Sequence, residues 1–284
     1  MSNSDSTTFS TPAPGGPTPA LVVETDDDAR VDVFDAYNVM ARREFGGVRA
    51  ALPPGLYRVR VERGGRIEDH LIEHTLGGTT LSLPAPGLST PTPVASPGAP
   101  QPDYAQAAVK YSMSDTCRPL AKAGAPSRIF VFQRRMSRAS QRGKARAPLS
   151  LRDETGRKLV DLTPEVTVQD DEVGFVAFGA QVDAGVYRLR AYGEPPRDVA
   201  VVVPPGRAAQ VFITDRGAQR LDDLRLLLPP VDRPFDPTGR PQRALEVALE
   251  ALVRGDRELP GTVARALQDG GAEQDLCFAL VCAH

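Results

Sequence analysis

The chain repeats one short motif, and this repeat constrains its fold more than any other feature of the sequence. PPGLYRVRV at 53–61 matches DAGVYRLRA at 183–191 without a gap, at an offset of 130 residues. Glycine permits a tight corner, and the tyrosine can bury its ring while its hydroxyl binds a backbone group across that corner. The matched pairs are Gly55 with Gly185, Tyr57 with Tyr187, Arg58 with Arg188, and Arg60 with Arg190.

The same offset continues beyond the motif and predicts three strands that repeat in register. Alternate residues of a strand point to opposite faces, so Arg58 and Arg60 are expected to share one face. The further pairs at this offset are Leu71 with Val201, Ile72 with Val202, Leu81 with Val211, and Leu83 with Ile213.

Short β-rich runs surround both copies of the motif. Residues 20–83 and 127–216 alternate apolar runs of four to eight residues with clusters of Gly, Pro and Asp, which is typical of small antiparallel sandwiches. The length of 284 residues also suits about two domains. We therefore predict a mainly β fold: two antiparallel β-sandwich modules, a Pro-rich linker between them, and a short α-helical C-terminal segment.

The segments outside the modules differ in composition. Residues 1–19 form a Ser/Thr/Pro-rich tail, and residues 84–103 hold seven prolines, a density that favours an extended spacer. The remaining expected segments are a short helix and loop at 104–126, a loop at 217–240 and a helical tail at 241–284.

The helical tail is predicted from its apolar pattern. Pro241 stands at the start of a broad apolar stripe that Gly255 closes, and Pro260 opens a second helix. Such short helices are marginal alone, so we expect them to pack on a partner or on the second module. The candidates for the apolar face are Leu245, Leu249, Leu252, Phe278 and Leu280.

An LPPG-x-Y-x-V-x-V strand near the end of a module this size resembles the carboxypeptidase-regulatory-like and PEGA-type β-sandwiches. The resemblance covers 20–83 and 127–214. It implies accessory or interaction domains without catalytic residues. The chain also resembles uncharacterised bacterial proteins in which such a module is followed by a helical tail.

HLIEH at 70–74 matches the H-x-x-E-H pattern of inverted zincins, in which a helix presents both histidines to zinc and the glutamate acts as base. Glycine pairs at 64–65 and 77–78 flank it and favour a strand, and at the offset of 130 the second copy reads AVVVP, without histidine. We favour a half-exposed strand. The residues of the remote alternative, a zinc peptidase, are His70, Glu73 and His74.

A basic segment at 134–146 follows the apolar run RIFVFQ and contains no acid. It has no aromatic residue on which bases could stack, so a nucleic-acid partner is not favoured. We interpret it as a solvated loop that could also take an acidic partner. Its candidate partner-binding residues are Arg134, Arg135, Arg138 and Arg142.

Catalytic patterns are scarce. Cys117, Cys277 and Cys282 form no CxxC pair, and the sequence holds no GxSxG, Walker or GxGxxG motif, so neither a disulfide framework nor a zinc knuckle is predicted. We expect no enzyme activity and no cofactor.

Charge and hydropathy bound the remaining functions. With 34 Lys and Arg against 36 Asp and Glu, the chain lacks the excess positive charge that grips DNA. Residues 1–19 lack the basic and apolar regions of a secretion signal, and the apolar runs are too short to span a bilayer, which predicts a cytoplasmic protein without membrane contact.

The sequence therefore predicts a non-catalytic protein-protein interaction or scaffold protein with an unknown protein partner, and it leaves a larger multi-subunit complex open. The alternative is a carbohydrate-binding sandwich, whose stacking platforms would have to be tyrosines because the chain has no Trp.

Overall fold

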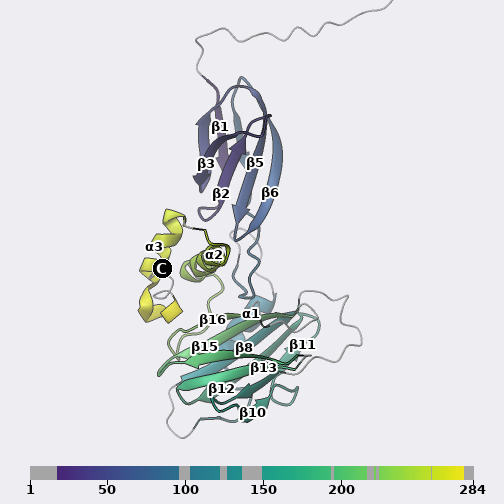
Figure 1. Cartoon of the computed structure of the whole chain (residues 1–284), viewed down its shortest axis with the longest axis vertical. Coiled ribbons are helices and arrows are strands. Elements are labelled where there is room, and N and C mark those ends of the chain that lie inside the picture. The colour runs from purple at the N-terminus through teal and green to yellow at the C-terminus, as the bar shows by residue number, and fades with distance from the viewer. Residues whose placement is uncertain are drawn as a thin grey trace, which may run out of the picture. The chain divides into compact units, whose positions relative to one another are not determined.

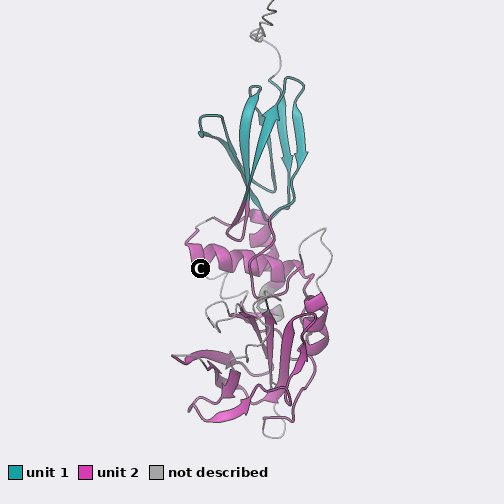
Figure 2. Cartoon of the chain, turned by 90° about the vertical axis from the view of Figure 1, so that its right-hand side faces the viewer, with its two compact units in different colours: residues 1–61, 68–85 teal, residues 62–67, 86–284 magenta. Residues whose placement is uncertain are grey.

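The computed structural model describes residues 18–95, 103–121, 127–135, 149–192, 195–215, 221, 224–256 and 258–277 (Figure 1). Over these ranges the chain is mainly β, with sixteen strands in four sheets and three α-helices, two of them near the C-terminus. Contacts divide it into two compact units (Figure 2). Unit 1 comprises residues 1–61 and 68–85, and unit 2 comprises residues 62–67 and 86–284.

Unit 1 contains two sheets that share one apolar core. The first sheet has the order β4-β1-β7, in which β1 pairs antiparallel with β4 and parallel with β7. The second has the order β3-β2-β5-β6. Alternate residues such as Leu21, Val31 and Val59 are fully buried between the two sheets. The strands are β1 (Ala20–Glu24), β2 (Arg30–Phe34), β3 (Met40–Phe45), β4 (Gly47–Ala51), β5 (Gly55–Arg63), β6 (Arg66–His74) and β7 (Thr79–Ser82).

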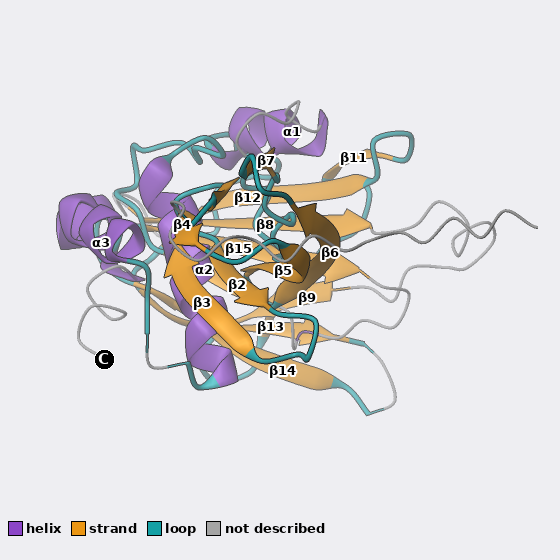
Figure 3. Cartoon of the chain, turned by 90° about the horizontal axis from the view of Figure 1, so that it is seen from above, coloured by secondary structure: helices purple, strands orange, loops and turns teal. Residues whose placement is uncertain are grey.

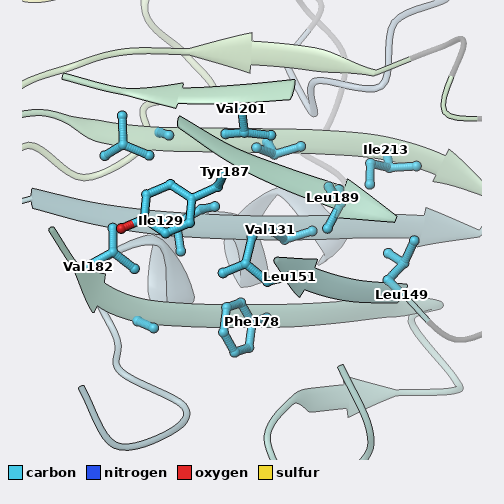
Figure 4. Close-up of a cluster of buried hydrophobic side chains, with 14 of the residues drawn as sticks. Ile129, Val131, Leu149, Leu151, Phe178, Val182, Tyr187, Leu189, Val201 and Ile213 are labelled. Carbon is cyan, nitrogen blue, oxygen red and sulfur yellow. The ribbon is translucent and has the colours of Figure 1, made fainter. Parts of the chain in front are cut away.

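Unit 2 also places two sheets around one core. One sheet has the order β10-β9-β13-β14 and the other the order β11-β12-β8-β15-β16. Side chains from both sheets meet in the core shown in Figure 4, among them Val131, Leu151 and Leu189. The strands are β8 (Ser127–Arg135), β9 (Leu149–Arg152), β10 (Lys158–Asp161), β11 (Val168–Asp170), β12 (Phe175–Val182), β13 (Gly185–Ala191), β14 (Arg197–Val203), β15 (Ala208–Asp215) and β16 (Arg225–Leu227).

The two units repeat one seven-strand arrangement. The order β3-β2-β5-β6 in unit 1 corresponds to β10-β9-β13-β14 in unit 2, and β4-β1-β7 corresponds to β12-β8-β15. The unusual parallel pair recurs as well, because β15 pairs parallel with β8 as β7 does with β1. Unit 2 extends the second of these sheets with β11 and β16 at its two edges.

The predicted register holds for two of the three strands and is wrong for the third. In β5 and β13 the offset of 130 matches Tyr57 with Tyr187, and both are buried. In β7 and β15 it matches Leu81 with Val211, and both face the core of their own unit. In β6, however, Leu71 is exposed where Val201 is buried.

A difference in the hairpins explains this shift. Arg60 and Asp69 form a cross-strand ion pair nine residues apart, whereas the equivalent pair of Arg190 and Asp198 is eight residues apart. The second hairpin is therefore one residue shorter, and a slip of one residue moves every side chain of a strand to the other face. The offset for β6 and β14 is 129, so Val199 and Val203 stand at the two histidine positions of HLIEH.

Helices cover the face of the five-stranded sheet of unit 2 that points away from the core between the two sheets. This face carries aromatic residues such as Phe130, Phe132 and Phe212, which pack with α1 (Asp103–Ser112), α2 (Arg240–Arg254) and α3 (Gly261–Gln274). Figure 3 shows these helices in purple and the strands in orange. Because both faces of the sheet are covered, β15 is buried along almost its whole length.

The ends of α2 follow the sequence signals. A proline lies in its first turn, where the missing N–H is not needed. Gly255 ends the helix in the left-handed conformation, and backbone N–H groups there bind the carbonyl oxygens of Ala251 and Leu252.

Part of the Pro-rich segment is packed against unit 2. Within residues 84–95, Pro86, Thr90 and the stretch 91–93 are buried. The prediction of an extended spacer did not include this packing: the hydroxyls of Thr90 and Thr92 bind Glu246, on a helix about 150 residues later in the chain. Residues 96–102 lie outside the described residues.

Candidate functional site

HLIEH lies in strand β6 and not in a helix. His70, Ile72 and His74 face the core side of the strand, while Leu71 and Glu73 are exposed on the other face. The glutamate therefore points away from the two histidines, and the three side chains do not converge as a zinc site requires. Among the described residues, no group of three or more His, Cys, Asp or Glu side chains could hold a metal ion.

His74 has a structural position. Its Nδ1 lies 3.1 Å from the hydroxyl of Thr79, and its Nε2 lies 3.1 Å from the carbonyl oxygen of Leu52. The ring also contacts Tyr57 edge to face, with the ring centroids 6.0 Å apart. The histidine thereby links strands at the end of unit 1.

The two motif tyrosines make the same hydrogen bond. The Tyr57 hydroxyl donates to the carbonyl oxygen of Pro53, and the Tyr187 hydroxyl donates to that of Asp183, each over 2.8 Å. Burial raises the pKa of both tyrosines, with a smaller contribution from a nearby aspartate in each case. Both hydroxyls therefore keep their proton and donate across the corner. Gly55 and Gly185 open the strands on which these tyrosines lie.

The basic segment has one described side chain, and it makes contacts within the unit. Arg134 donates to the hydroxyl of Tyr104 and to the carbonyl oxygen of Thr90, and its guanidinium lies 4.8 Å from the centroid of the Tyr104 ring. It holds α1 and the Pro-rich segment to β8, so it is not part of a free basic loop. Arg135 ends β8, and its side chain lies outside the described residues, as do Arg138 and Arg142.

The apolar candidates of the helical tail divide by exposure. Leu245 is fully buried and Leu249 packs partly against the same core, so both cover the sheet of unit 2. Of the two alternatives left open for the apolar face, a partner or the second module, Leu245 fits the second module. Leu252 is 43% exposed and Val253 is 76% exposed. Phe278 and Leu280 lie outside the described residues.

Glu246 on α2 is the most enclosed acid in the described chain. Its carboxylate accepts hydrogen bonds from the hydroxyls of Thr90 and Thr92, and Arg225 lies 3.3 Å from it. Burial raises the pKa of Glu246, and these polar neighbours oppose that rise. A buried carboxylate with this many donors connects the Pro-rich segment, β16 and α2.

The described cysteines are not activated. Burial raises the pKa of Cys117 and raises that of Cys277 far above its usual range. A thiol with a raised pKa is a poor nucleophile at neutral pH, because the thiolate is the reactive form. Cys282 lies outside the described residues.

The tyrosines proposed as sugar platforms are mostly engaged. The rings of Tyr57 and Tyr187 are buried, Tyr104 lies under Arg134, and Tyr111 packs on Phe175. Tyr37 is 88% exposed, on the turn between β2 and β3. Tyr192 is half-buried and accepts a hydrogen bond from Arg152. The tyrosines therefore do not form a stacking surface of several rings.

Unit 2 carries an arginine-rich surface that was not predicted from the sequence. It is the outward side of sheet β10-β9-β13-β14, opposite the core, and we call it the arginine face. Its members are Ser150, Arg152, Lys158, Asp161, Val186, Arg188, Arg190, Asp198, Ala200 and Val202. The sequence feature that could have indicated this surface is YRLRA at 187–191, in which arginines alternate with residues that are buried in the structure.

Cations lie side by side across the arginine face. Lys158 pairs across the strands with Arg152, and Arg152 pairs with Arg188. Lys158 binds Asp161 over 2.7 Å. Arg152 donates to the carbonyl oxygen of Gly156 and to the hydroxyl of Tyr192. Arg188 makes no hydrogen bond or ion pair with another described residue.

Comparison with known proteins gives no family for the chain. No protein-family profile matches it, and no curated protein matches it. Among solved structures, the Bacillus anthracis TIE protein superposes with a TM-score of 0.25 at 10% identity, covering 71% of this chain and 34% of that one. GBS52, the minor pilin of Streptococcus agalactiae, superposes with a TM-score of 0.19 at 9% identity, covering 69% of this chain and 94% of that one. Superpositions at these TM-scores do not establish a shared fold.

None of the helices in the described part of the chain combines the length and the apolar character needed to cross a membrane.

Proposed function

We propose that the chain is a non-catalytic binding protein built from two tandem β-sandwich modules of the carboxypeptidase-regulatory-like or PEGA type. The observation that carries this proposal is the repeated seven-strand arrangement, together with the repeated tyrosine corner and the repeated Arg–Asp pair. The two copies share the scaffold and differ in their helices and surface charge. We propose that a partner recognises unit 2 by these differences.

The chemistry of the candidate catalytic groups supports the same proposal. His74 is bound between backbone and hydroxyl groups inside unit 1, and Glu73 points away from it. The thiol of Cys277 is held protonated by burial. These groups stabilise the modules and are poorly placed to act on a substrate, so we propose that the partner is a protein and that the chain itself catalyses nothing.

The proposal is tested with the full chain. In-cell crosslinking to a tagged chain should yield a specific protein, and the same complex should be recovered when that protein carries the tag. Truncation of 241–284 is not a suitable control, because α2 and α3 cover an apolar sheet face. The exposed pair Leu252 and Val253 can instead be changed to lysine to test whether α2 contributes.

A direct activity test completes this experiment. We expect the purified chain to release no more peptide from casein with zinc than without it. Zinc bound in stoichiometric amount, with hydrolysis that Glu73→Gln abolishes, would overturn the proposal in favour of a peptidase.

A further inference from the structure

At the centre of the arginine face lies a cation, the guanidinium of Arg188, to which no described residue is hydrogen-bonded. Arg188 is exposed and lies directly opposite Arg152 across two paired strands. Like charges directly opposite each other destabilise a sheet. The described residues supply Arg188 with no counter-ion at hydrogen-bond distance, because Asp198 is bound bidentately by Arg190, at 2.5 and 2.6 Å.

The equivalent arginine of unit 1 is in a different situation. Arg58 donates to the side-chain oxygen of Asn38 over 2.5 Å, and its guanidinium lies 4.5 Å from the centroid of the Phe34 ring. Both modules therefore keep the arginine, but among the described residues only the Arg58 side chain is hydrogen-bonded within its own module, whereas Arg188 lies within electrostatic range of Asp198. No described residue occupies the side-chain donors of Arg188, so they are available to a ligand.

The neighbours of Arg188 define the ligand. Val186 and Val202 lie opposite each other on the same face, two residues along the strands from Arg188, and are 41% and 48% exposed. Two residues along a strand span about 6.8 Å. An extended peptide with an apolar residue and a carboxylate at positions i and i+2 has this spacing, so both of its side chains can meet the face together.

The row of residues on the other side of Arg188 argues against a polyanion. There Asp161, Ser150, Arg190 and Asp198 lie side by side across the strands. The acids at both ends of this row would repel a continuous line of phosphates or sulfates. The face therefore fits one carboxylate next to an apolar contact, and not a run of negative charges.

We infer that the arginine face of unit 2 binds an extended acidic segment of a protein partner, with a carboxylate on Arg188 and an apolar side chain on Val186 and Val202. The inference rests on the proposed function and names its surface and the chemistry of its partner. Arginine suits this role because its planar fork binds a carboxylate through two parallel hydrogen bonds.

The test measures binding of fluorescent synthetic peptides to the full chain by anisotropy. One peptide repeats Val-Thr-Glu-Thr, and its control repeats Val-Thr-Gln-Thr. We expect the glutamate peptide to bind at least about tenfold more tightly than the control, and we expect binding to weaken as salt rises. Arg188→Gln should remove this preference, while Val186→Ser should weaken binding of both peptides.

The matched control is Arg58→Gln, the same change at the equivalent position of unit 1. Both arginines lie on the outward face of a sheet, so both variants should keep the circular dichroism spectrum of the wild type. Arg58→Gln should leave peptide binding unchanged. Equal losses from the two variants would overturn the inference, because they would indicate attraction by overall charge.

Two further outcomes would overturn it. One is a heparin fragment that binds more tightly than the glutamate peptide and also depends on Arg188, which would assign the face to a polyanion. The other is no preference for the glutamate peptide in the wild type. In that second case a protein partner recovered by reciprocal crosslinking would still support the proposed function, so the two failures are distinguishable.

Discussion

At the residue scale, the motif tyrosines offer the cleanest test of the repeat. Tyr57→Phe and Tyr187→Phe each remove one hydroxyl and keep the ring, so each should lower the free energy of unfolding of its unit by about 1 kcal/mol. The measurement is calorimetric unfolding of each variant beside the wild type. Since the lost bond is equivalent, the two changes should have similar effects, and a large difference between them would contradict the equivalence of the two corners.

The carboxyl group of Glu246 gives unit 2 a dependence on pH. Burial raises its pKa in the folded state above the unfolded value of about 4.3. Folding then favours the protonated form, so the contribution of this group to stability is complete below the unfolded pKa and is lost as pH rises through the folded pKa.

Glu246→Gln removes this titration while keeping the shape of the side chain. Relative to the wild type, the variant should become more stable as pH rises from about 4 to 8. Urea denaturation at several pH values measures this difference, in which the contributions of other groups cancel. Parallel pH curves for the two proteins would show that the folded carboxyl titrates at its ordinary pKa.

At the element scale, α2 has a covered side and an exposed side. Leu245→Ala should cost about 2 to 5 kcal/mol, because Leu245 is fully buried against the sheet of unit 2. Leu252→Ala makes the same chemical change seven residues later, on a residue that is 43% exposed, and should cost no more than about 0.5 kcal/mol. Denaturant unfolding compares the two variants, and equal costs would contradict the face assigned to the helix.

The elements also show what the sequence could predict. The motif located β5 and β13, and the Pro and Gly signals located α2, because these depend on local backbone geometry. The slip between β6 and β14 was not predictable from an ungapped offset, because that offset matches Leu71 and Ile72 with two valines of β14, and these apolar pairs do not show which residue faces the core. The Arg–Asp pairs reveal the facing residues.

The candidate site was less predictable than the fold. The composition of 84–103 predicts a spacer, yet Thr90 and Thr92 bind Glu246. The composition of a segment does not reveal a contact between residues more than 150 positions apart. In the same way, the charge run at 134–146 drew attention to Arg134, which is bound by Tyr104. The exposed Arg188 lies in a strand, where charge counting along the chain does not reveal which cations meet across the sheet.

At the scale of the whole molecule, the same strand arrangement occurs twice, and different elements pack against its two copies. In unit 1 the sheet β4-β1-β7 has one core, whereas in unit 2 the corresponding strands have a core on each face because three helices cover the second one. A compact unit with its own core is expected to unfold on its own.

Equivalent core substitutions test that expectation. Val59 and Leu189 occupy the same position in β5 and β13, and both are fully buried. Val59→Ala should cost unit 1 about 2 kcal/mol, and Leu189→Ala should cost unit 2 about 2 to 5 kcal/mol. Cys277 reports on unit 2, because its thiol packs against both cores of that unit and its raised pKa keeps it unreactive while folded.

Alkylation of Cys277 should therefore follow the opening of unit 2. Leu189→Ala should speed it by at least about 30-fold, which corresponds to 2 kcal/mol in the open population, whereas Val59→Ala should leave it unchanged. Fragment ions in mass spectrometry locate the label on Cys277, because Cys282 lies on the same tryptic peptide. If Val59→Ala accelerates the reaction as strongly, the two modules open together. If neither variant does, Cys277 becomes accessible by a local motion that spares the core of unit 2.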